Sequence, residues 1–177
     1  MNARFVRTTI AVASLLSVPM LAAAQDTSSG TLTVTATVSS SIAMTFENDG
    51  AGVSMTGAGT NAATMALGTI SAYETIATAG VTRTLGAADF TVSSPFGVKV
   101  VKANSSSSNY TLTAALGAAD ATNTWMINAV TLTTSNQPLG ATYNYGSAVT
   151  HTVYLTVPFS ATAGAISKVL NFTATAN

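Results

Sequence analysis

The feature that most constrains this chain is a two-residue alternation near its start, in residues 30–47. Apolar side chains occupy alternate positions, and Thr or Ser fills most of the positions between them. The apolar set is Leu32, Val34, Ala36, Val38, Ile42, Met44 and Phe46. Because successive side chains of a β-strand point to opposite faces, this segment predicts a long strand with one apolar face and one hydroxyl face. The apolar face has to pack into a sheet, either of its own domain or of a neighbouring molecule.

The same alternation returns in the second half of the chain, most clearly in residues 149–159 and 166–176. Turn residues separate roughly eight such segments at intervals of about eight to twelve residues, and none has a helical period. The pattern predicts an all-β fold, an immunoglobulin-like antiparallel β-sandwich with Greek-key connections. Two details are expected within it. Pro95 ends the strand that begins at Phe90, and residues 125–134 form a single strand.

The first residues have the features of a secretory signal peptide. Arg4 and Arg7 precede an apolar run over residues 9–22, and Ala22–Ala24 supply small residues for cleavage after Ala24. We therefore predict a signal peptide at 1–24, an N-terminal extension at 25–40 and one sandwich domain at 41–177. No later run is long and apolar enough for a membrane span. The mature chain is expected to be exported through the periplasm to the cell surface or the medium.

The charge balance excludes one class of partner. Removing residues 1–24 takes away Arg4 and Arg7 and no acidic residue, which leaves four basic side chains against six acidic ones. Nucleic-acid binding requires a basic surface, so it is rejected.

Charged residues make up 7% of the chain, against about 25% in average globular proteins. The strands therefore have few of the charged residues that usually prevent edge-to-edge pairing. The chain has no cysteine, so packing and backbone hydrogen bonds must hold the exported domain together.

Both ends of the chain resemble one known family. The segments TLTVTATV at 31–38 and SIAM at 41–44 are similar to the N-terminal segment of pilins assembled by the alternate chaperone–usher route, the cysteine-free colonisation-factor type. The ending ATAGAIS at 161–167, followed by VLNFTAT at 169–175, is similar to the final strand of such subunits. Ile166 stands where an aromatic residue is commoner in that family. Spore-coat-U-like secreted sandwiches share the same general features.

The resemblance implies donor-strand complementation, in which a subunit lacks one strand and the N-terminal extension of the next subunit fills the resulting groove. Residues 25–40 would then be the donor segment. Its subunit-interface residues would be Leu32, Val34, Ala36 and Val38. The partners would be other copies of the chain in a head-to-tail homopolymer, together with a periplasmic chaperone and an usher. A strand added to an open sheet edge gains main-chain hydrogen bonds, and its alternate side chains fill pockets. The alternative is that residues 31–46 form the first strand of a complete sandwich.

The residues offer little for catalysis or for cofactor and metal binding. His151, the only histidine, shares a strand face with Val149 and Val153, which favours burial over a role as a base. There is no Gly-x-Ser-x-Gly motif for a serine hydrolase, and one histidine without cysteine cannot form a zinc site. Glu47 and Asp49 lack EF-hand spacing and are expected in a solvated turn. We therefore predict no catalytic residue, cofactor or metal.

Two functions remain from the sequence. The first is a non-enzymatic structural subunit of a pilus- or fimbria-like surface filament with a role in adhesion. The second is a monomeric secreted sandwich that binds glycan or another surface ligand. In that second case Trp125, Tyr143 and Tyr145 are the candidates for stacking on a sugar, although a single Trp at a strand start is also typical of a core.

Overall fold

The structure is a computed structural model, and it describes residues 28–177. The signal peptide predicted at residues 1–24 lies outside this range. The chain divides into two units, Met1–Ala36 and Thr37–Asn177. All regular elements of the described residues are strands. They are β1 (Ser41–Glu47), β2 (Thr82–Leu85), β3 (Asp89–Ala103), β4 (Asn109–Leu116), β5 (Thr124–Ile127), β6 (Val130–Thr131), β7 (Gln137–Pro138), β8 (Tyr143–Asn144), β9 (Ala148–Pro158) and β10 (Leu170–Ala176).

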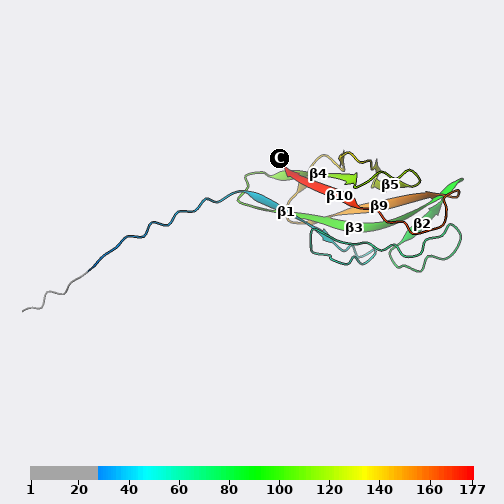
Figure 1. Cartoon of the computed structure of the whole chain (residues 1–177), viewed down its shortest axis with the longest axis horizontal. Coiled ribbons are helices and arrows are strands. Elements are labelled where there is room, and N and C mark those ends of the chain that lie inside the picture. Colours follow the sequence, from blue (N-terminus) through cyan, green and yellow to red (C-terminus); the bar gives the residue numbers. More distant parts are fainter. Residues whose placement is uncertain (1–27) are drawn as a thin grey trace, which may run out of the picture. The chain divides into compact units, whose positions relative to one another are not determined.

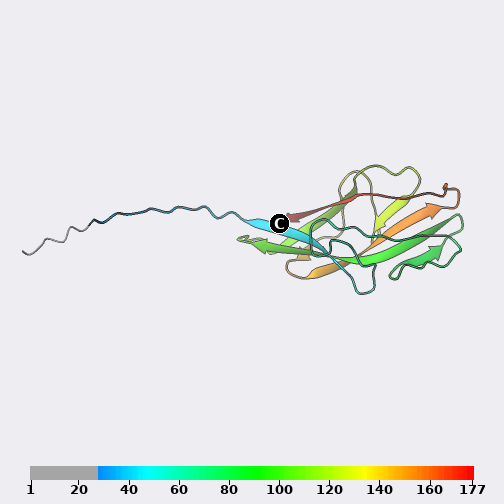
Figure 2. The same ribbon diagram turned by 60° about the horizontal axis from the view of Figure 1, so that its bottom comes forward.

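These strands form two antiparallel sheets (Figure 1). The larger sheet has the order β1-β3-β9-β5-β6, with β2 also paired to β3. The smaller sheet has the order β10-β4-β7, with β8 also paired to β4. The long strands β3 and β9 run side by side through most of the domain (Figure 2). The chain is therefore an all-β sandwich, as the alternation predicts.

The core lies between the two sheets and follows the two-residue period. Along β3, every second residue from Phe90 to Val100 is buried, whereas the residues between them, apart from Gly97, are partly exposed. On the opposite sheet Leu112 is fully buried. The alternation of apolar and hydroxyl side chains thus becomes an inner and an outer face of each sheet.

The expected strand break at Pro95 is wrong, because β3 continues through it for 15 residues. The neighbouring strands explain why proline is tolerated there. On one side of β3, the pairing with β2 ends at Ser93 and the pairing with β1 begins at Gly97. Pro95 lies in the interval between them, where β3 has no strand partner on that side. A residue without an N–H group is acceptable where the ladder is interrupted.

The expected single strand over residues 30–47 is also wrong. Only Ser41–Glu47 forms a strand, paired to β3 from Ser41 opposite Ala103 to Glu47 opposite Gly97. Residues 28–40 have no regular structure, and all of them are exposed. The alternation predicts a strand along the whole segment, but the strand begins only at Ser41. The alternation does not show, however, whether an extended segment has a sheet to pair with.

The segment expected as one strand at residues 125–134 is a hairpin instead. β5 and β6 pair with Ile127 opposite Val130, which leaves a two-residue turn at Asn128 and Ala129. Asn128 adopts a left-handed conformation with φ of 53°, which asparagine tolerates better than other non-glycine residues. Its side chain accepts a hydrogen bond from the backbone N–H of Thr152 at 2.9 Å, so the turn is attached to β9.

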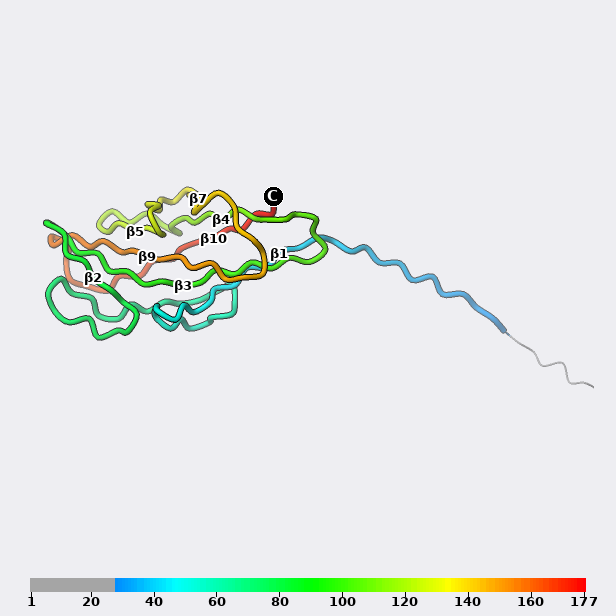
Figure 3. The backbone as a smooth tube through the Cα atoms, turned by 180° about the vertical axis from the view of Figure 1, so that it is seen from behind, coloured from blue at the N-terminus to red at the C-terminus, as the bar shows by residue number. Residues whose placement is uncertain are grey.

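A long irregular connection, residues 48–81, joins β1 to β2 and lies beside β2 and β3 (Figure 3). It crosses β3 closely at Gly52, where a Cβ atom would come within 1.9 Å of the carbonyl oxygen of Pro95. The backbone N–H of Val53 donates to the buried hydroxyl of Ser94. These contacts hold the connection against β3 near Pro95, where β3 has no strand partner on that side.

Candidate functional site

A groove of about 1020 Å³ with an apolar floor lies beside the start of β10. Residues 61–70 of the long connection form one wall, and residues 164–172 form the other. The floor consists of inward-facing side chains of the larger sheet and its connection: Phe46, Met55, Phe96, Trp125, Val153 and Leu155. These floor residues belong to the hydrophobic core, so the groove is a place where the core reaches the surface.

The wall beside β10 includes an unpaired strand edge. β10 pairs with β4 from Leu170 opposite Leu116 to Ala176 opposite Tyr110. Within the described residues it pairs with no other strand. One row of its backbone N–H and C=O groups therefore has no partner strand, and such a row can accept another extended chain. Two large apolar side chains of the same wall are exposed, Ile166 by 39% and Val169 by 66%.

An aromatic cluster of groove-lining residues joins the two sheets. The ring of Phe172 lies edge-on to Phe46 at 5.2 Å and to Phe96 at 5.8 Å between ring centroids. Phe172 comes from the smaller sheet, and the other two rings come from the larger one. The two sheets therefore contact each other through these three rings. The groove extends from this contact towards Leu170 and residues 164–169.

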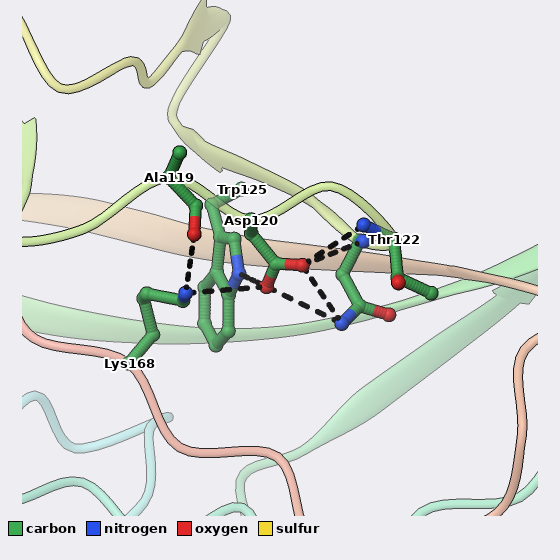
Figure 4. A network of polar contacts seen from close by, with 6 residues as sticks. Ala119, Asp120, Thr122, Trp125 and Lys168 are labelled. Atoms are coloured by element: carbon green, nitrogen blue, oxygen red, sulfur yellow. Dashed lines mark hydrogen bonds and ion pairs between the residues drawn. The ribbon is translucent and has the colours of Figure 1, made fainter.

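A polar network centred on Asp120 connects the floor to this wall (Figure 4). The carboxylate accepts hydrogen bonds from the backbone N–H groups of Thr122 and Asn123 at 3.1 and 3.0 Å. It also accepts one from the indole Nε1–H of Trp125 at 2.8 Å. The Asn123 N–H and the Trp125 indole hold the pKa of Asp120 well below its usual range, because both stabilise the ionised form. Asp120 is therefore a carboxylate at neutral pH.

Lys168 completes this network from the groove wall. Its ammonium lies 3.8 Å from the Asp120 carboxylate, and it donates to the backbone carbonyl of Ala119 at 3.1 Å. Both charged side chains are largely buried, with exposed fractions of 16% for Lys168 and 10% for Asp120. Next along the chain, the carbonyl of Val169 accepts from the N–H of Gly117 at 2.8 Å.

The predicted interface residues of the N-terminal extension are strongly exposed. Leu32, Val34 and Val38 are 88%, 81% and 73% exposed, and Ala36 is exposed as well. Among the described residues, only one other large hydrophobic side chain, Tyr73 at 76%, is as exposed as these three. A contiguous exposed apolar stripe of this kind is typical of a segment that binds a partner surface.

The three aromatic residues suggested for sugar stacking do not form one exposed platform. Trp125 is 8% exposed and belongs to the groove floor. Tyr143 and Tyr145 are partly buried and pack on Tyr110, at centroid distances of 5.6 and 5.2 Å. The hydroxyl of Tyr143 donates to the carbonyl of Leu139. These rings mainly contribute to packing.

His151 is fully buried, in agreement with its position on the apolar face of β9. Its Nδ1 lies 3.1 Å from Nδ2 of Asn128, and its Nε2 is buried without a hydrogen-bond partner. Phe96 and Tyr143 flank the ring. Burial lowers the pKa of His151.

The acidic residues of the first turn accept hydrogen bonds from neighbouring groups of the protein. Asp49 accepts hydrogen bonds from the N–H of Ala51 and the hydroxyl of Thr150, and Glu47 accepts one from Thr45. Within residues 28–177, no three His, Cys, Asp or Glu side chains are grouped so that they could hold a metal ion.

The groove and the Asp120 network were not found by sequence reasoning. Within the wall at 61–70, Ala63, Met65 and Leu67 are half-buried at alternate positions, which is a short strand-like pattern in a segment without a strand partner. Asp120 lies in the connection between β4 and β5. Its pairing with Lys168, 48 residues later in the chain, leaves no local sequence pattern.

No family model, curated protein or solved structure matches this chain. Separately, the described part of the chain contains no helix that is long and apolar enough to cross a membrane.

Proposed function

We propose that this protein is a non-enzymatic, exported structural subunit that forms a surface filament by donating its N-terminal extension to the groove of the next copy. One observation carries the proposal. A domain with an apolar groove beside a free strand edge also has an extended segment whose alternate apolar side chains are exposed. The groove and the segment have complementary chemistry, because strand addition needs both a backbone edge and pockets for alternate side chains.

The strand order supports an immunoglobulin-like sandwich that lacks its last strand. In the constant-type immunoglobulin fold, strands A, B, E and D form one sheet, and C, F and G form the other. β1, β3, β9 and the β5–β6 hairpin correspond to A, B, E and D, while β4 and β10 correspond to C and F. The position of strand G would lie beside β10, at the free edge that forms one wall of the groove.

The energetics favour a contact that uses both backbone and side chains. Full burial of Leu32, Val34 and Val38 contributes about 1.5–3 kcal/mol each, with less from Ala36. Association costs about 4–15 kcal/mol in lost freedom. The side chains alone would therefore roughly balance this cost, and the main-chain hydrogen bonds to β10 supply the surplus. A contact of this head-to-tail kind does not close on itself and generates a filament.

The test compares two charge substitutions on opposite faces of the extension. L32K/V34K places two lysines on the apolar face, and T33K/T35K places the same two charges on the hydroxyl face. We expect the wild-type chain and T33K/T35K to polymerise and L32K/V34K to remain a folded monomer, as measured by sedimentation and negative-stain electron microscopy. Equal behaviour of the two variants would refute the proposal.

A monomeric wild-type chain would favour the second candidate, a glycan-binding module. The observation that supports it is an exposed aromatic pair away from the three residues suggested by the sequence. Tyr73 is 76% exposed, and its ring lies 5.9 Å from that of Phe159. Specific hits on a glycan array, lost in Y73S, would support that function.

A further inference from the structure

The groove wall at residues 164–169 is attached to the rest of the sandwich at very few points. Within the described residues, positions 164–168 make no backbone–backbone hydrogen bond. The attachments are the Gly117–Val169 hydrogen bond and the two contacts of the Lys168 ammonium, to Asp120 and to the carbonyl of Ala119. Among the hydrogen bonds and ion pairs that residues 164–169 make within the described part of the chain, two of the three are thus made by the Lys168 side chain.

Asp120 connects this wall to the groove floor. One oxygen of its carboxylate, Oδ2, accepts from the Trp125 indole and also faces Lys168. Both Trp125 and Lys168 line the groove. The indole ring on the floor and the methylene stem of Lys168 in the wall are thus held by the same charged group, as Figure 4 shows.

We propose that the Asp120–Lys168 pair is a clamp that positions the groove wall for the incoming extension. The inference rests on the proposed function, because it names the residues that prepare the same groove. Without the clamp, the exposed side chains of Ile166 and Val169 are free to turn onto the apolar floor and occupy the groove themselves. A wall that is held in place before binding also reduces the ordering cost of association.

The clamp predicts that Lys168 matters through its charge more than through its packing. K168M keeps an apolar stem and removes the charge, whereas K168R keeps the charge and can still bind the carboxylate. K99M is the matched control, because Lys99 lies on β3 opposite Thr45 and Ala148 and does not line the groove.

The test uses the full exported chain with the L32K/V34K change, so that its own extension cannot polymerise, and a synthetic peptide of residues 30–40 as the probe. We expect K168M to weaken peptide binding about tenfold, equivalent to about 1.4 kcal/mol. K168R and K99M should bind within about twofold of the parent, since neither removes the clamp. In K168M the Gly117 amide should also exchange its hydrogen faster, because its acceptor belongs to the released wall.

The outcomes separate this inference from the proposed function. If K168M binds the peptide as well as the parent, or K168R binds as weakly as K168M, the clamp is refuted while strand donation stands. If the parent itself does not bind the peptide, the proposed function fails. The clamp is then judged by Gly117 exchange and by an anilinonaphthalene dye that reports exposed apolar surface. Unchanged exchange and dye binding in K168M would overturn it.

Discussion

His151 is expected to make the sandwich less stable as the pH falls below about 6.5, because the structure holds its imidazole neutral. The N–H of Thr152 donates to Oδ1 of Asn128, which orients the amide so that Nδ2 faces Nδ1 of His151. Nδ1 is therefore a hydrogen-bond acceptor, and the proton of the neutral ring lies on Nε2. Protonation would place a second donor against the Asn128 amide and bury an uncompensated charge.

The sign and size of the effect follow from linkage. Burial lowers the pKa of His151 in the folded state, whereas the unfolded chain has a value of about 6.5. Above pH 6.5 both states are neutral, and stability does not depend on this group. Below it, the unfolded chain binds a proton that the folded chain does not. The free energy of unfolding then falls by up to about 1.4 kcal/mol per pH unit, until the folded pKa is reached. Between pH 6.5 and 5.0 the loss is at most about 2 kcal/mol.

The measurement is urea unfolding of the monomeric L32K/V34K chain at several pH values between 5.0 and 7.5. His151 is the only histidine of the chain, and carboxyl groups ordinarily titrate near 4, so this interval isolates the imidazole. H151Q should be less stable at pH 7.5 but should lose most of the slope. A flat profile in the parent, or an equal slope in H151Q, would refute the reasoning.

Two further predictions concern other parts of the domain. G52A should lower the free energy of unfolding by about 1–3 kcal/mol, because its Cβ would overlap the carbonyl oxygen of Pro95; G50A, where a Cβ meets nothing within 4 Å, is the control. Urea unfolding at neutral pH measures both, and equal stability of the two variants would contradict the described path of the long connection. Asp120, whose pKa is lowered, contributes stability that is present above its unfolded pKa of about 3.9 and is lost as the pH falls below it. D120N should therefore flatten the thermal-unfolding profile between pH 4 and pH 2, and an unchanged profile would show that another group causes the acid sensitivity.

The fold could be predicted from the sequence where local alternation determines it. The period of two in residues 149–159 correctly indicates a strand with one buried face, and the buried position of His151 follows from it. In residues 166–176 the same period predicts a strand that in fact begins only at Leu170, and its inner face is half-buried. The errors at Pro95 and at residues 125–134 have a different origin. Proline is tolerated because two neighbouring strands stop on either side of it, and the Asn128 turn of the hairpin is attached to Thr152 of β9. Both features are set by partners distant in sequence.

The candidate site divides in the same way. The apolar face of residues 32–38 is visible in the sequence, because it is a local pattern. The groove is not, since it is formed where residues 61–70, β10 and the larger sheet come together. The Asp120–Lys168 pair joins two turns that no periodicity relates. The entry of the extension into this groove is a proposal, and the L32K/V34K and T33K/T35K variants test it.

The groove wall that ends at Phe172 has a length that can be compared with the length of the N-terminal extension. The wall from Gly164 to Phe172 spans at most about 26 Å if it is fully extended, at about 3.3 Å per residue. Side chains on one face of a strand repeat every second residue, so this distance has room for about five of them. The extension carries four, from Leu32 to Val38. If the extension enters the groove, the wall is therefore long enough to take all four apolar side chains of the stripe at once.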